Sequence, residues 1–155
     1  MDLVDIGVNL TSDRFNNDRE AVLERAVDAG VRRMLVTGTG VTASREASEL
    51  AARHPGCLWS TAGIHPHAAR DCDDAALAEL RTLARDNPGV VAIGETGLDF
   101  NRDFSPRADQ ENAFARQLEL ATELGLPVFI HERDAHERLS AMLREHVAAL
   151  PDAVV

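Results

Sequence analysis

Short apolar runs alternate with helical patterns along the chain. The apolar runs predict strands at residues 3–9, 33–38, 57–63, 90–94 and 127–131. Apolar residues that recur every three or four positions predict helices between these strands. The predicted helices run from about Asn17 to Gly30, over 44–53, from near Asp73 to Asn87, over a long segment ending at Gly125, and onward from Asp134. The last helix has Glu137 three residues after Asp134, which predicts a start resembling a capping box.

This alternation is typical of βαβ units and a parallel sheet. The strands are continuous apolar runs, as expected when both faces of a parallel sheet are covered. The repeat length favours a (β/α) barrel or a doubly wound sheet. No GxGxxG or P-loop follows the first strand, which argues against a nucleotide-binding domain.

Residues 150–155, with the sequence LPDAVV, resemble the start of a sixth strand. A full eight-unit barrel takes about 250 residues. Five units and the start of a sixth strand would leave an unpaired sheet edge, which proteins normally avoid. We therefore expect residues 1–155 to form a single α/β domain, an incomplete barrel that is the N-terminal part of a longer protein.

Composition excludes several function classes. The chain has 26 acidic and 16 basic residues, a net charge of −10, and every base is arginine. This balance opposes a basic nucleic-acid-binding stripe, so attraction of a polyanion would need a bound metal and a few local arginines. No segment approaches the ~20 apolar residues of a membrane span. The acidic N-terminus resembles no signal peptide, and Cys57 and Cys72 form no disulfide framework, so we expect a cytoplasmic protein.

Polar side chains gather where the predicted strands end. In parallel α/β folds, functional sites form at the carboxyl ends of the strands. The residues at these ends are Asn9, Thr37, His65 with His67, Glu95, and His131 with Arg133. Carboxylate and imidazole are suitable ligands for Mg²⁺, Mn²⁺ or Zn²⁺. The sequence therefore predicts a divalent-metal site that includes Glu95 and His131.

Each of these residues also has a structural interpretation. Glu95 could cap the following turn, and His131 could bond a backbone carbonyl. The GIHPH segment could be a rigid turn fixed by Pro66, and we favour a functional role for His65 and a structural one for His67. Arg133 could pair with a surface acid. The remaining histidines, which we interpret as ordinary helix residues, are His54, His136 and His146.

The segments DIGVNLTS, STAGIHPH, VVAIGETGLDFNRDFS and PVFIHERDAHERL together closely resemble the TatD family of metal-dependent deoxyribonucleases. The resemblance implies a TIM barrel that hydrolyses DNA phosphodiester bonds with one or two divalent ions, commonly Mg²⁺. It also implies 3′→5′ exonuclease action on single strands, a role in DNA repair or degradation, and a monomeric full-length protein. By this resemblance Glu95 and His131 are catalytic metal ligands, and the substrate contacts are His65, Arg133 and Asn9.

Two departures from the family pattern affect this interpretation. Most members carry His-x-His at the end of the first strand, where this chain has Gly7 and Asn9. The family's next histidine ligand and its late catalytic aspartate are expected beyond Val155, so we expect little or no turnover from these 155 residues alone. The alternatives are a related metal-dependent amide or lactone hydrolase and an inactive truncated remnant.

Overall fold

The computed structural model describes residues 2–146, 150 and 153–154. The strands are β1 (Leu3–Val8), β2 (Val31–Val36), β3 (Leu58–Ala62), β4 (Val90–Asp99), β5 (Val128–Arg133) and β6 (Ala153–Val154). The α-helices are α1 (Arg19–Asp28), α2 (Val41–Arg53), α3 (Asp74–Asp86), α4 (Arg107–Leu124) and α5 (His136–His146). Two 3₁₀ helices, η1 (Asp13–Phe15) and η2 (Pro66–Asp71), follow β1 and β3.

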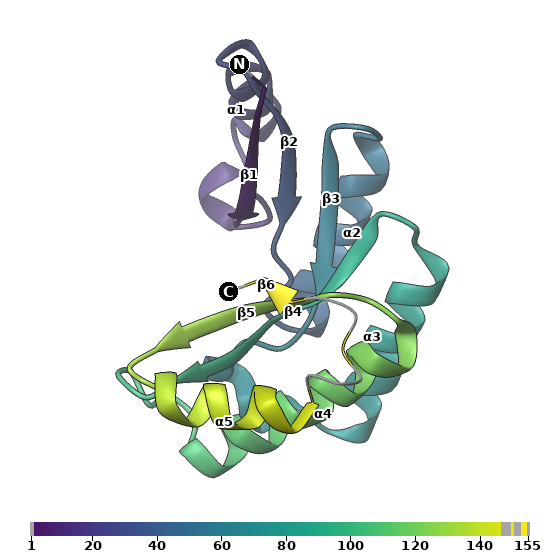
Figure 1. The fold of residues 1–155 in the computed structure, drawn as a ribbon. Helices are drawn as coiled ribbons and strands as arrows, with labels where there is room; N and C mark the ends of the chain where they lie inside the picture. The colour runs from purple at the N-terminus through teal and green to yellow at the C-terminus, as the bar shows by residue number, and fades with distance from the viewer. Residues whose placement is uncertain (1, 147–149, 151–152, 155) are drawn as a thin grey trace.

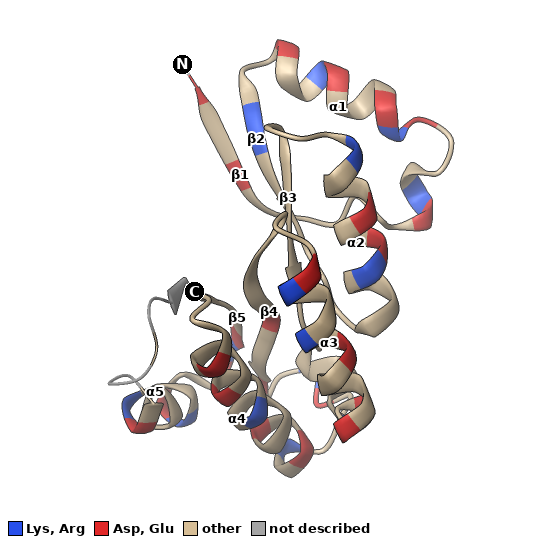
Figure 2. Cartoon of the chain, turned by 90° about the vertical axis from the view of Figure 1, so that its right-hand side faces the viewer, with Lys and Arg blue, Asp and Glu red and all other residues tan. Residues whose placement is uncertain are grey.

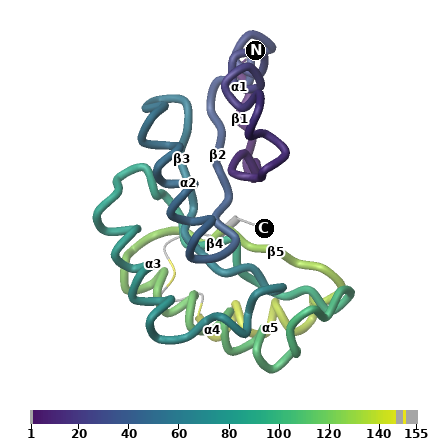
Figure 3. Tube along the Cα trace, turned by 180° about the vertical axis from the view of Figure 1, so that it is seen from behind, coloured from purple at the N-terminus to yellow at the C-terminus, as the bar shows by residue number. Residues whose placement is uncertain are grey.

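All strand pairs in the sheet are parallel, and the strand order is β1-β2-β3-β4-β5-β6. The sheet curls strongly, so that β4 and β5 run across the direction of β1 and β2 (Figure 1). From behind, α2, α3, α4 and α5 lie along the outer, convex side of the curl (Figure 3). This half-barrel confirms the predicted incomplete TIM-type α/β architecture.

The helices carry most of the charge, and the strands carry little (Figure 2). Buried apolar residues form two clusters between the helices and the sheet. The larger cluster joins β3, β4 and β5 to α3, α4 and α5, and the smaller one joins β2 and β3 to α1 and α2. None of the helices in the described part of the chain combines the length and apolar content needed to span a membrane.

The concave face of the sheet differs from the expectation that both faces are covered. Val4 and Ile6, which lie on this face, are 55% and 52% exposed. An apolar groove of about 350 Å³ runs across β1–β4, between Ile6 and Trp59. The prediction of a doubly covered sheet is therefore wrong for β1.

Two predicted element boundaries are also wrong. The fourth strand does not end before Glu95 but continues to Asp99, so Glu95 lies within the strand. The last helix begins at His136 rather than Asp134, which adopts a left-handed φ of 52°. The Asp134 carboxylate accepts a hydrogen bond from Asn101 Nδ2 (2.7 Å), and the helix begins two residues after Asp134, so the predicted capping box with Asp134 as N-cap does not form.

A buried glutamine ties α4 to the segment that follows β3. Gln117 is fully buried, and its Oε1 accepts a hydrogen bond from the Ile64 N–H at 2.8 Å. Its Nε2 donates to the Ile64 carbonyl at 3.0 Å. Because Ile64 immediately precedes His65, this pair of bonds fixes the backbone at a predicted site residue.

Gln117→Ala should lower the free energy of unfolding by about 1–3 kcal/mol, because both polar groups of Ile64 would be buried without a partner. Urea unfolding measures this change. The matched control is Glu119→Ala, an exposed position on α4, which should change stability by less than about 0.5 kcal/mol. Equal stability of the two variants would contradict the role given to Gln117.

Candidate metal centre

Three neighbouring strands bring two histidines and a glutamate together. His65 follows β3 and caps η2, Glu95 lies in β4, and His131 lies in β5. One possible ligand atom from each residue lies within 4.8 Å of the other two. All three side chains are partly buried. The segment after β3 and the carboxyl-terminal halves of β4 and β5 therefore build one compact group of donors.

A bulge in β4 directs Glu95 toward this group. Ile93 pairs with Val128 and Thr96 with Ile130, so two residues of β4 stand opposite a single residue of β5. Such a bulge re-aims the side chain that it carries. It requires close backbone approach, since a Cβ at Gly94 would collide with the Phe129 carbonyl oxygen. The extra residue and the small Gly94 together explain why the strand continues past the predicted end.

The three side chains interact directly. Glu95 Oε1 lies 3.1 Å from His131 Nδ1 and 3.8 Å from His65 Nε2. The hydrogen bond with Glu95 raises the pKa of His131, outweighing burial. Burial acts to raise the pKa of Glu95, but the His131 hydrogen bond and the neighbouring histidines lower it. Burial, reinforced by His131 and His67, lowers the pKa of His65 to about 4. At neutral pH the group thus offers an ionised carboxylate and at least one neutral imidazole.

A fourth residue, Asp99, contacts two of the neighbouring histidines, His67 and His131. Its side chain is fully buried, and Oδ2 lies 2.7 Å from His67 Nε2 and 3.4 Å from His131 Nε2. Burial acts to raise the pKa of Asp99, but the backbone N–H of Arg102 and the bond with His67 lower it to about 2. His131 is therefore held between two carboxylates, Glu95 and Asp99.

Sequence reasoning did not single out Asp99, and it favoured a structural role for His67. Both lie beside the donor group, and the His65 and His67 ring centroids are 4.3 Å apart. A signal for Asp99 was present, because residues two and four positions apart on a strand share a face. The predicted strand ended too early for this rule to connect Asp99 with Glu95.

The donor group lines an open cavity of about 500 Å³. Asn9 and His67 line the same cavity, whereas Arg133 is exposed and is not among its lining residues. The structure thus brings Asn9, His65, Glu95 and His131 to one cavity and leaves Arg133 outside it. The roles of all five residues stay predictions.

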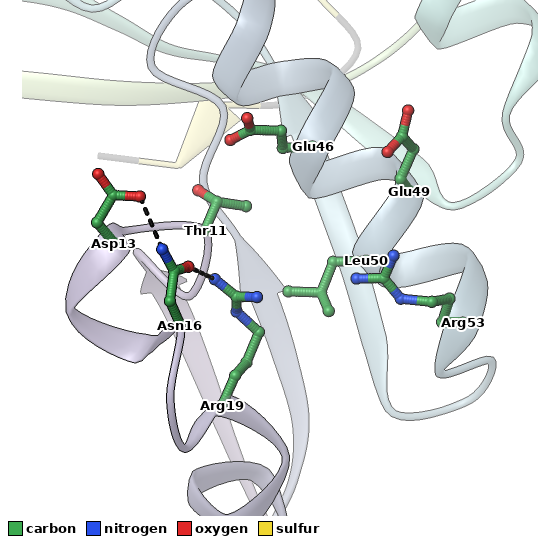
Figure 4. A pocket seen from close by; sticks show the side chains of 8 residues that line it. All are labelled: Thr11, Asp13, Asn16, Arg19, Glu46, Glu49, Leu50 and Arg53. Carbon is green, nitrogen blue, oxygen red and sulfur yellow. Dashed lines mark hydrogen bonds between the residues drawn. The ribbon is translucent and has the colours of Figure 1, made fainter.

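A second polar cavity of about 310 Å³ lies between η1 and α2 (Figure 4). Arg19 donates to Asn16 Oδ1 (3.0 Å). Three acids, Asp13, Glu46 and Glu49, and a second arginine, Arg53, also line the cavity. The two arginines offset most of the negative charge of the three acids, and the cavity contains none of the predicted site residues. The possible metal ligands lie in the other cavity, at the strand ends.

The donor set fits a divalent cation. Two imidazoles and a carboxylate suit Zn²⁺, Mn²⁺ or Mg²⁺, with the carboxylate favouring the harder ions. The Nε2 atom of His131 is buried and makes no hydrogen bond within the described residues, although Asp99 lies beside it. A carboxylate next to the second nitrogen of a ligating histidine is the usual support of a metal site.

The model of the family described as TatD related DNase matches residues 4–155. The chain belongs to this family. Among curated relatives, the chain is 55% identical over 153 residues to "3'-5' ssDNA/RNA exonuclease TatD" of Musicola paradisiaca, covering 99% of this chain and 58% of the relative. The protein of the same name from Klebsiella pneumoniae is 51% identical, with coverages of 99% and 57%. This TatD-related chain thus spans less than two thirds of the length of these relatives.

Solved structures of the family share the fold. The TatD homolog YJJV from Escherichia coli has a TM-score of 0.84 at 31% identity, covering 93% of this chain and 56% of that one. A hydrolase of the TatD family from Entamoeba histolytica has a TM-score of 0.86 at 30% identity, with coverages of 96% and 55%. An uncharacterized amidohydrolase from Saccharomyces cerevisiae has a TM-score of 0.84 at 27% identity, with coverages of 96% and 52%.

Metal binding to the TatD-related chain should strengthen as the pH rises. The pKa of His131 is raised, and its imidazole must lose a proton before it can ligate. Calorimetric titration with Mn²⁺ should show affinity that increases between roughly pH 6 and pH 8. His131→Ala should weaken binding at least about tenfold, and the matched control, His136→Ala on the exposed start of α5, should leave it unchanged. Equal affinities for both variants would exclude His131 as a ligand.

Asp99→Asn should lower the free energy of unfolding at neutral pH by about 2 kcal/mol. Because the folded-state pKa of Asp99 is lowered, its stabilisation is present above the ordinary value of 3.8 and is lost as the pH falls through about 2. The difference between wild type and variant in urea unfolding should therefore shrink as the pH falls from about 4 to about 2. Asp86→Asn, at the exposed end of α3, is the control. A pH-independent difference would refute this electrostatic origin.

Proposed function

We propose that this chain supplies the metal centre of a phosphodiesterase that removes nucleotides from the 3′ end of single-stranded nucleic acid. The observation that carries the proposal is the group of His65, Glu95 and His131, whose possible ligand atoms lie within 4.8 Å. Family membership and the names of the relatives support the substrate class. DNA is the substrate we predict from the sequence motifs, and the relatives' name adds RNA.

Glu95 and His131 would hold the ion, and His65 lies close enough to join them. A divalent ion, for which we propose Mg²⁺ with Mn²⁺ or Zn²⁺ as alternatives, supplies positive charge against a phosphodiester and makes water more acidic. The side-chain amide of Asn9 lies in the same cavity, where it can donate a hydrogen bond to a phosphate oxygen. We assign Arg133 the same task by family resemblance.

The residues behind the centre would keep it in place. Asp99 accepts backbone hydrogen bonds from Asn101 and Arg102, so its position is fixed by the loop that follows β4. Its carboxylate in turn orients His67 and lies beside His131. A donor group held in this way needs little reorganisation when its ligand arrives.

The net charge of −10 is compatible with an exonuclease. An enzyme that grips a short strand end needs no long basic track, because a few local contacts suffice. A cytoplasmic location, a monomeric full-length protein and a single-domain organisation stay predictions from the sequence.

A related hydrolase that cleaves amides or lactones is the second candidate. One structural neighbour is described as an amidohydrolase. The same metal centre could polarise a carbonyl group, so the geometry of the donors alone favours neither reaction. Family membership and the relatives' names favour the nuclease.

The test is a substrate panel of single-stranded DNA, a nitrophenyl phosphodiester and a lactone, each with Mg²⁺. We expect slow, metal-dependent release of mononucleotides from the DNA and no lactone turnover. The rate should be low, because the chain spans only 58% of the length of its relatives. Glu95→Gln should reduce the DNA reaction at least about a hundredfold. The matched control is Glu137→Gln, which is exposed on α5 and should keep the wild-type rate.

Lactone turnover without DNA turnover would favour the second candidate. Absence of both turnover and metal binding would indicate the inactive remnant. An undiminished DNA reaction in Glu95→Gln would refute the proposed role of this centre.

A further inference from the structure

Phe104, in the loop between β4 and α4, is the most exposed large apolar side chain in the described part of the chain, at 58%. Phe104 is not among the residues that line the apolar groove of the sheet. The loop that carries it follows β4, at the edge where β4 and β5 end (Figure 1). The Phe104 ring centroid is 4.7 Å from that of His67. The His67 ring contacts His65, whose ring centroid is 4.5 Å from that of His131. A row of rings thus leads from solvent to the metal centre.

The loop holds Phe104 firmly from both sides. Before it, the Arg102 N–H donates to Asp99 Oδ1 at 2.8 Å. After it, the buried Ser105 donates through Oγ to the His67 carbonyl at 2.9 Å. The Ser105 carbonyl accepts from Gln110 Nε2 at 2.9 Å. Because these bonds fix the backbone, a ligand that stacks on the ring pays little to order it.

The Arg102 guanidinium completes the surface. Its carbon lies 6.0 Å from the centre of the Phe104 ring, and its side chain is exposed. Among residues 2–146, no carboxylate forms an ion pair with Arg102, whereas nearby Arg107 is paired with Asp103. An aromatic face beside a guanidinium matches a nucleotide, which combines a flat base with a phosphate.

We propose that Phe104 stacks on a base of single-stranded nucleic acid while Arg102 contacts a phosphate of the same strand, next to the metal centre. The substrate class rests on the proposed function. Every base has a π-face, so stacking on Phe104 is independent of base sequence. An exonuclease that removes successive nucleotides needs this tolerance.

The experiment compares two fluorescein-labelled hexamers, an oligothymidylate and an all-abasic strand with the same phosphates. Affinities for the whole chain are measured by fluorescence anisotropy with EDTA and again with Ca²⁺. We expect the wild type to bind the oligothymidylate more tightly. Phe104→Ala should weaken that binding by about 5- to 150-fold and leave binding of the abasic strand unchanged within about twofold. Phe104→Trp should retain the preference for bases.

Arg102→Gln should weaken the binding of both hexamers by the same factor. It should also make the slope of the logarithm of the binding constant against the logarithm of the salt concentration less steep by about 0.7. The matched control for Phe104 is Val27→Ala, another exposed apolar side chain, on α1 (39% exposed), which should change neither affinity. Binding of the abasic strand also reports that Phe104→Ala is folded.

The subsite is overturned if the wild type shows no preference for bases, or if Phe104→Ala weakens both hexamers equally. An unchanged affinity of Phe104→Ala for the oligothymidylate overturns it too. The exposed Phe104 ring would then be a candidate contact for a protein partner instead. If Glu95→Gln keeps full hydrolytic activity but Phe104→Ala still loses base-dependent binding, the metal-centre proposal fails and the subsite stands.

Discussion

The close approach of β4 to β5 is the constraint on which the candidate site depends. Gly94 allows the backbone of β4 to reach Phe129 without collision, and the resulting bulge sets two residues against one. The bulge turns Glu95 toward His131, at 3.1 Å. Four residues farther along the same strand, Asp99 lies on the other side of the His131 ring, at 3.4 Å. One strand thereby supplies both carboxylates that hold this imidazole. A larger residue at position 94 would separate the strands and dissolve the arrangement.

The net charge of the chain and the local charges at the strand ends act over different distances. The helices carry most of the charge, and the sum is −10 (Figure 2). Salt screens such exposed charges beyond about 8–10 Å, so a polyanionic strand meets mainly the local chemistry at the strand ends. There the structure gathers two partly buried histidines and a cavity of about 500 Å³, and the exposed Phe104 ring, with Arg102 beside it, contacts the cavity residue His67. In the proposed function, these local donors and the Phe104 ring would take the place of a basic track.

The concave face of the sheet shows the consequence of having six strands in the described part of the chain. The interior of a complete barrel is filled by layers of side chains from alternate strands. Val4, Ile6 and Trp59 have the apolar character of such layers, and Val4 and Ile6 are more than half exposed. The convex face, by contrast, is sealed by the helices and holds both buried clusters. The helices cover one face of the sheet, and the sheet in turn positions the residues of the candidate metal centre.

The sequence by itself determined the alternation of strands and helices, the parallel sheet, the family, and the gathering of His65, Glu95 and His131 at one edge. These features follow from local periodicity and motifs, because neighbouring parallel strands present their carboxyl ends together. Only the tertiary structure decided how far β4 extends, where α5 begins, that Asp99 and His67 stand behind the donors, and that Phe104 faces solvent. The extent of β4 and the placement of Asp99, His67 and Phe104 depend on contacts between segments more than 30 residues apart, such as β4 with β5 or Ser105 with His67. Local patterns do not specify such contacts: the alternation along β4 could connect Asp99 with Glu95 only once the full length of the strand is known.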